Sequence, residues 1–178
     1  MAEFTWYMAR ATGIVAVVLL SISVAVGILT TMRPKIAGWP RWVTEGVHKN
    51  VSLLATCFLG VHILTVVVDP ISPVGLVNAI IPFTGSYRPL AVGLGAVAVD
   101  LLAAVVITSL LRTHISRRVW KAVHWSAYAC WPFALLHGLT AGTDASARWT
   151  QAVYVACAGL VGAAVVWRTA PAIAQRPA

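Results

Sequence analysis

Long apolar stretches separated by short polar segments dominate the pattern of the chain. Each of five stretches holds about 20 residues with few charges, the length that an α-helix needs to cross about 30 Å of hydrocarbon. The pattern therefore predicts five transmembrane helices. Their expected ranges are 11–31, 47–68, 90–111, 119–139 and 149–167.

A shorter element is expected between the second and third stretches. The segment DPISPVGLVNAIIPFTGSYRP is long and mostly apolar. Ser72 followed by Pro73 is a typical helix start, and Pro82 is a typical stop. The segment is therefore either a short helix along the membrane surface or a packed loop, and the pattern leaves both open.

The composition agrees with a membrane protein. Hydrophobic residues make up 60% of the 178 residues and charged residues only 10%, whereas soluble domains are about half apolar and a quarter charged. The expected fold class is all-α, an integral membrane helical bundle surrounded by lipid. We expect one domain over residues 1–170 and a short tail over 171–178. No basic segment precedes the first stretch, so no cleavable signal peptide is expected.

The distribution of charge predicts the topology. The net charge is +8, but the basic residues lie in short loops beside apolar stretches, so nucleic-acid binding is not expected. The first and third loops are basic, whereas the second and fourth are nearly neutral. The positive-inside rule predicts a cell-membrane protein whose basic loops and C-terminus face the cytoplasm and whose N-terminus lies outside.

Histidines are the residues with the most specific chemistry. His48 and His62 lie 14 residues apart in the second stretch, and His124 and His137 lie 13 apart in the fourth, whereas His114 lies in a basic loop. Both stretches are expected to start at the cytoplasmic face. Two histidines should therefore face each other at each of two depths, about 20 Å apart.

Opposed imidazoles held on rigid helices are what a haem iron with two histidine ligands needs. Histidine is also costly inside a bilayer, where it usually marks function. A spacing of 14 returns to within about 40° of the same helix face, but a spacing of 13 misses it by about 140°. We therefore expect the fourth helix to be distorted near Trp131 and Pro132, because proline removes a backbone hydrogen bond and kinks helices.

Four segments resemble the ferric reductase-like transmembrane domain: ARATG, VHKNVSLLATCFLGVH, ITSLLR and RRVWKAVHWSAYACWPFALLHG. That family includes the membrane part of the NADPH oxidases and the haem-binding membrane subunit of bacterial methionine sulfoxide reductase systems. The resemblance covers about residues 6–140, and the paired histidines are its specific part. It implies two stacked b-type haems that carry electrons outward. His48 and His124 would ligate the inner haem, and His62 and His137 the outer one.

The chain departs from larger members of that family. They commonly have six spans and a flavin and nicotinamide domain, whereas five spans and no GxGxxG motif are readable here. We therefore expect a component of an oxidoreductase. A separate cytoplasmic reductase, a flavoprotein or quinol would supply its electrons, and an unidentified acceptor would receive them outside.

Several charged residues are candidates for further roles. Haem propionates attract cations near each membrane face. The candidate contacts are Arg41, Lys49, Arg112 and Arg118 on the inner side and Arg10 and Arg88 on the outer side. Asp100 lies in the middle of the third stretch. It is expected to be a proton site, a hydrogen-bond partner of a ligand imidazole, or a structural contact within the bundle.

Two other functions remain open. The chain could be a quinol-handling cytochrome b subunit that anchors a soluble oxidoreductase. It could also be a haem-free proton-coupled transporter or scaffold that uses its histidines and Asp100 for protons. A colourless purified protein would favour the haem-free alternative.

Overall fold

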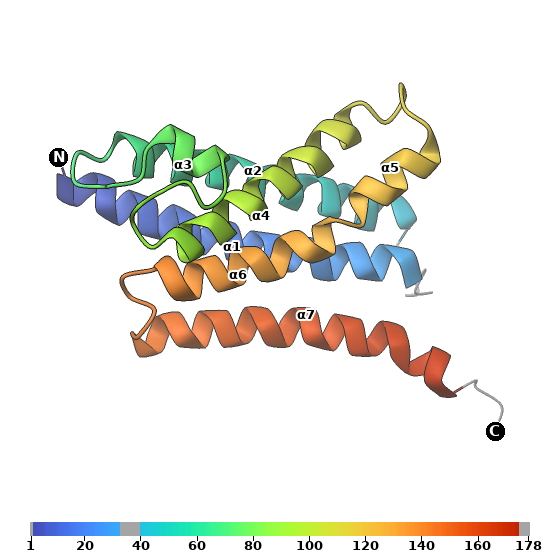
Figure 1. The fold of residues 1–178 in the computed structure, drawn as a ribbon. Coiled ribbons are helices and arrows are strands. Elements are labelled where there is room, and N and C mark those ends of the chain that lie inside the picture. Colours follow the sequence, from blue (N-terminus) through green and yellow to red (C-terminus); the bar gives the residue numbers. More distant parts are fainter. Residues whose placement is uncertain (1, 33–39, 175–178) are drawn as a thin grey trace.

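The bundle is built from long helices. The computed structural model describes residues 2–32 and 40–174, and all regular structure in them is helical. The four helices long and apolar enough to span a membrane are α1 (Ala2–Met32), α2 (Arg41–Val68), α4 (Pro89–Leu110) and α7 (Arg148–Ala174). The predicted all-α membrane bundle is thus confirmed, and the protein is a multi-pass membrane protein. Figure 1 shows α3 at one end of the bundle and α5 at the other.

The remaining expected span, residues 119–139, is not one helix. It is divided into α5 (Arg117–His124) and α6 (Ala127–Ala141) by a turn at Trp125 and Ser126. The predicted position of the distortion, Trp131 and Pro132, is therefore wrong. Pro132 lies inside α6 without ending it.

Ser126 accounts for the break. Its hydroxyl donates to the carbonyl of Val123 at 2.7 Å, and its amide donates to the same carbonyl at 2.9 Å. The amides of Tyr128 and Ala129 also bond three residues back. Serine hydroxyls that take a helix carbonyl bend the helix, and bonds of this spacing wind it to 3.0 residues per turn. The extra rotation, about 20° for each residue wound in this way, makes up part of the mismatch of about 140° between His124 and His137 on an ideal helix.

Helix α1 is central, since it packs against α2, α6 and α7. By contrast, α2 packs mainly on α1, and only 6% of the most apolar 18 residues of α2 are buried. Trp131 of α6 donates from Nε1 to Oγ of Ser21 at 2.8 Å. A buried apolar cluster joins α1 and α7: Val24, Ala25, Ile28, Val161 and Ala164.

The loop between α2 and α4 contains a helix of five residues, α3 (Leu76–Ile80). It begins later than Ser72 and Pro73, because the Ser72 hydroxyl accepts a hydrogen bond from the amide of Val74 and forms a turn. The side chains of Leu76 and Ile80 are more than half exposed, as expected for a helix at a membrane surface.

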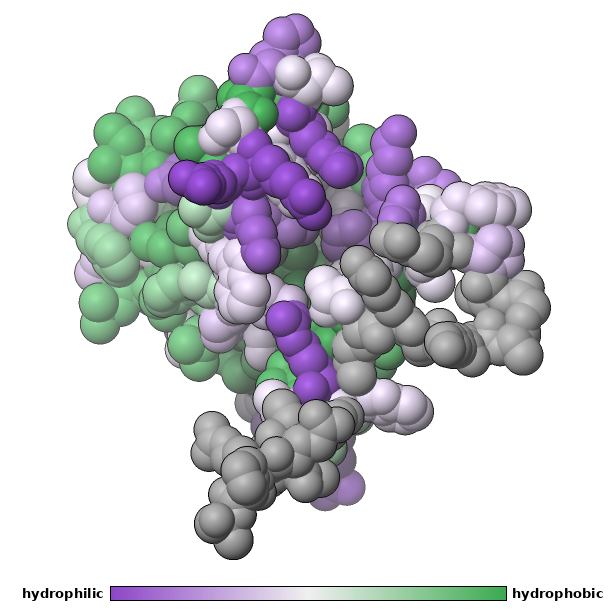
Figure 2. All heavy atoms as spheres, turned by 90° about the vertical axis from the view of Figure 1, so that its right-hand side faces the viewer, coloured by the Kyte–Doolittle hydropathy of each residue, from purple (hydrophilic) through white to green (hydrophobic). Residues whose placement is uncertain are grey.

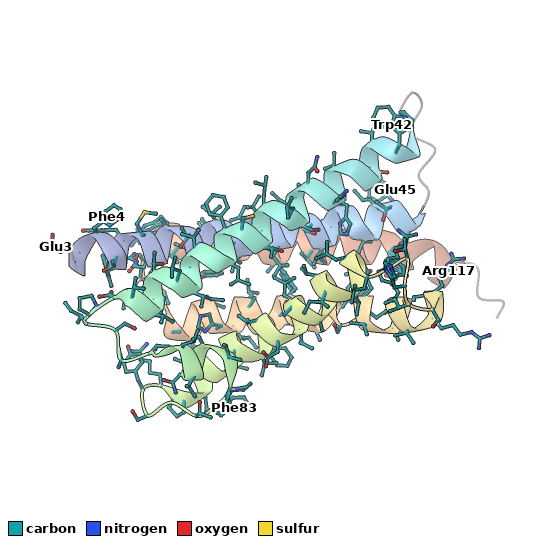
Figure 3. The ribbon with its side chains drawn as sticks, turned by 90° about the horizontal axis from the view of Figure 1, so that it is seen from above. Glu3, Phe4, Trp42, Glu45, Phe83 and Arg117 are labelled. Carbon is teal, nitrogen blue, oxygen red and sulfur yellow. The ribbon has the colours of Figure 1, made fainter. Side chains whose placement is uncertain are left out.

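Phe83 fixes this loop to α4. Its backbone is left-handed, with φ 63°, and a Cβ atom at Gly93 would overlap its ring. Figure 3 shows Phe83 and Glu3 at one end of the bundle and Trp42 and Arg117 at the other.

Three expected boundaries differ from those observed. Helices α1 and α2 start earlier than the apolar stretches do, at Ala2 and Arg41. Helix α7 continues to Ala174, into the predicted tail, whose residues 175–178 lie outside the described residues.

Candidate functional site

Four histidines form two facing pairs. His48 faces His124 with 6.2 Å between the ring centroids, and His62 faces His137 with 6.3 Å. The ring planes cross at 74° in both pairs. We call His48 and His124 the basic-end pair, and His62 and His137 the α3-end pair. His114 is exposed, and its Nδ1 lies 3.1 Å from the Thr113 hydroxyl.

The ring of His62 rests on a local structure of α1 that the sequence analysis did not predict. Its Nδ1 lies 2.7 Å from the carbonyl oxygen of Ala9. The ring also lies over Gly13, where a Cβ atom would stand 2.9 Å from Nδ1. A carbonyl and a glycine four residues later thus form a support for the imidazole, which we call a carbonyl–glycine cradle.

Two more histidines occupy the same kind of cradle. The Nδ1 atom of His137 lies 2.8 Å from the carbonyl oxygen of Ala91, and a Cβ atom at Gly95 would stand 2.6 Å from it. For His48 the carbonyl belongs to Ser23, 3.0 Å away, and the glycine is Gly27.

The cradles fix the protonation of three rings. A carbonyl oxygen only accepts hydrogen bonds, so Nδ1 of each ring is the protonated nitrogen. The neutral ring then keeps the lone pair on Nε2, the atom available for a metal. A hydrogen bond of this kind orients metal-binding histidines and raises their basicity.

Matching spacings are the sequence signal that points to these cradles. Gly13 and Gly27 are 14 residues apart, as are His48 and His62. Two antiparallel helices with equal spacings bring both glycine–histidine pairs into contact. Glycines at those positions of α1 could therefore have been assigned to the histidines of α2.

His124 has no such cradle. Its Nδ1 is buried without a hydrogen-bond partner in the described part of the chain. The imidazole instead stacks on the indole of Trp120, with 4.9 Å between centroids and 25° between planes. The guanidinium of Arg112 lies over the same indole, 4.8 Å from its centroid.

A cavity of about 620 Å³ surrounds the α3-end pair. Its walls come mainly from α1, α2, α4, α6 and α7, with Ala79 of α3 and the loops before and after these helices, and His62 and His137 are among its lining residues. The volume is typical of cavities that enclose a small molecule or cofactor. The low burial of α2 and this cavity together indicate room for a group between α2 and α6.

The donor set suits haem iron. In the described residues, no three His, Cys, Asp or Glu side chains converge on a point that could hold a metal ion. The histidines come in twos, which is the number of axial ligands that haem iron takes. A metal held linearly between two imidazole nitrogens, at about 2 Å from each, separates the ring centroids by about 6 Å. Both pairs have that separation.

The candidate cations at the α3 end already have partners. Arg10 forms an ion pair with Asp144, and its guanidinium lies 4.1 Å from the centroid of Trp6. Arg10 and Asp144 both line the cavity. Arg88 donates from Nη1 to the carbonyl of Thr140 at 3.1 Å.

The other candidate cations belong to the opposite end of the bundle. Lys49 follows His48 directly on α2, and Arg118 lies on α5, both exposed. Arg112, also exposed, contacts Trp120. Arg41 starts α2, but its side chain lies outside the described residues. Figure 2 shows hydrophilic side chains gathered on this end.

Asp100 is not part of either histidine pair. It is exposed in the middle of α4, and no hydrogen bond or ion pair of its side chain is observed within residues 2–32 and 40–174. Of the three alternatives for Asp100, neither the contact within the bundle nor the bond to a ligand imidazole is observed in this part of the chain.

The geometry agrees with a comparison to known protein families. The family model described as "Ferric reductase like transmembrane component" matches residues 12–135. This match covers more than half of the chain and includes His48, His62 and His124, with His137 just beyond its end. No curated protein and no solved structure matches the chain. The chain belongs to the ferric reductase-like transmembrane family.

Proposed function

We propose that this protein carries electrons across a cell membrane through two stacked b-type haems. The observation that carries the proposal is the pair of matched ring separations, 6.2 Å at the basic end and 6.3 Å at the α3 end. Membership of the family supports the same function.

The histidines would act as axial ligands in facing pairs. His48 and His124 would hold the basic-end haem, and His62 and His137 the α3-end haem. Bound haem supplies a one-electron carrier at each level. The protein supplies rigid orientation, because three of the four rings are fixed by a carbonyl and a glycine. Rigid ligands keep the geometry the same in both oxidation states, which limits reorganisation during transfer.

The direction of transfer follows from the charge of the two ends. The positive-inside rule assigns the basic end, with Arg112, Arg118 and Lys49, to the cytoplasm. Electrons would enter there from a reductase, a flavoprotein or quinol and leave near α3 for an outer acceptor. The same basic residues, together with Arg41, are candidates for the inner propionates. Arg10 and Arg88 are candidates for the outer ones.

Haem stoichiometry tests the proposal. The dithionite-reduced spectrum of the purified protein should show a b-type α band, with two haems per chain. We expect His48→Ala and His62→Ala each to lose one haem, whereas His114→Ala should keep both, since His114 is exposed on a loop. A single haem in the wild type would rule out the stacked arrangement, and a colourless protein would favour the haem-free alternative.

The donor can be identified with the protein in liposomes. Reduction by a cytoplasmic-type flavoprotein, without reduction by quinol, would support transfer from a soluble donor. Reduction by quinol alone would instead support the quinol-handling cytochrome b subunit.

A further inference from the structure

The basic-end pair is unsymmetrical, and the difference lies at His124. Its partner His48 has Nδ1 bonded to the Ser23 carbonyl at 3.0 Å and a glycine beneath the ring. His124 has neither, and its buried Nδ1 has no partner within the described residues.

Helix α4 provides a carbonyl–glycine cradle for His137 but not for His124. The residues 13 and 14 positions after Gly95 are Thr108 and Ser109, and both carry a Cβ atom. The Thr108 hydroxyl also donates to the carbonyl of Ala104 at 2.7 Å. The turn of α4 that would have to support His124 thus has no glycine.

For His124, the indole of Trp120 supports the imidazole in place of a carbonyl–glycine cradle. Trp120 lies four residues before His124, so both side chains project from the same face of α5. The two rings stack nearly parallel, at 25° and 4.9 Å. The Arg112 guanidinium, 4.8 Å from the indole centroid, holds the indole in turn.

We propose that Trp120 is a positioning residue for His124. By stacking, it fixes the plane of this imidazole, which for the other three histidines is fixed by a backbone hydrogen bond over a glycine. This inference rests on the proposed function for its consequence: Trp120 sets the ligand geometry of the basic-end haem and leaves the α3-end haem untouched.

A haem-independent measurement tests the stacking itself. In the haem-free protein in nanodiscs, with ¹³C-labelled histidine, the ring protons of His124 should be shifted upfield by the indole ring current. Trp120→Leu should abolish that shift, and Trp120→Phe should retain part of it. Trp149→Leu is the control, because Trp149 is 54% exposed and lies at the start of α7, outside the helix that carries His124. An unchanged His124 signal in Trp120→Leu would overturn the proposal.

A second measurement tests the consequence for the ligand. In the ferric haem-loaded protein, Trp120→Leu should change the low-field g value of one haem, or lose that haem, while the other signal stays in place. Trp120→Phe should restore the wild-type signal. The loss of both haems, or no change in either, would contradict a positioning role for Trp120.

The two measurements separate the possible failures. A wild-type protein without haem would refute the proposed function, while the histidine spectra still decide on the stacking. Two haems, combined with spectra insensitive to Trp120→Leu, would refute the positioning role and leave the proposed function standing.

Discussion

The imidazole of His137 lies against the backbone of Gly95, where a Cβ atom would stand 2.6 Å from Nδ1. The ring can take this position only because residue 95 has no side chain. The same relationship links Gly13 to His62, at 2.9 Å, and, less tightly, Gly27 to His48, at 3.1 Å from Cε1. In each of these three helix contacts, the imidazole approaches closely because the glycine has no Cβ atom.

Gly95→Ala should displace His137 and destabilise the bundle. Overpacking of this kind costs about 1–3 kcal/mol, and Gly27→Ala should cost less because its contact is looser. The measurement is thermal unfolding in detergent together with haem per chain. Gly60→Ala is the control, since nothing lies within 4 Å of a Cβ atom at that position. Equal effects of Gly95→Ala and Gly60→Ala would show that the close approach has no energetic role.

Gly138→Ala should be destabilising for a different reason. A Cβ atom at position 138 would overlap the hydroxyl of Tyr154 on α7. In a Tyr154→Phe background part of that clash is removed, so the cost of Gly138→Ala should fall. A double-mutant cycle of unfolding free energies measures this coupling. Additive effects would mean that the Tyr154 hydroxyl contributes nothing to the cost of Gly138→Ala.

Trp131→Phe should cost about 0.5–1.5 kcal/mol of unfolding free energy, because it removes the hydrogen bond from the indole to the buried Ser21 hydroxyl. Trp125→Phe is the matched control, since Trp125 is 52% exposed. An equally large loss of stability in Trp125→Phe would show that the effect comes from replacing any tryptophan by phenylalanine and not from the hydrogen bond to Ser21.

Ser126→Ala should disturb the histidine pairs more than Pro132→Ala does. The Ser126 hydroxyl competes for the Val123 carbonyl at the break between α5 and α6, whereas Pro132 lies inside a continuous α6. We expect Ser126→Ala to lower haem per chain or to shift the ferric spectrum. Pro132→Ala should keep both haems. A larger effect of Pro132→Ala than of Ser126→Ala would indicate that Pro132 causes the distortion.

Asp100→Leu should leave the unfolding free energy within about 0.5 kcal/mol of the wild type, since Asp100 is exposed. Membrane insertion of the isolated α4 segment should improve by about 3 kcal/mol, because a central aspartate is costly there. Glycosylation mapping of insertion checks the second expectation. A fall of the unfolding free energy by more than 2 kcal/mol would contradict the first.

Much of this protein is determined by the sequence alone. Apolar stretches of about 20 residues can satisfy their backbone hydrogen bonds in a bilayer only as helices, so the helical bundle could be predicted from hydropathy. The spacings of 14 and 13 residues were enough to predict which histidines share a depth, because the rise per residue of a helix is fixed.

Other features were decided only by the tertiary structure. The break at Trp125 and Ser126 depends on a hydroxyl competing with the backbone, and proline was the stronger but misleading local signal. The pairing of Arg10 with Asp144 joins residues more than a hundred positions apart. No local pattern encodes that contact, because it arises from how α1 packs against the segment before α7. For the same reason, only the packing of the helices decided which backbone carbonyls complete the cradles of His48, His62 and His137.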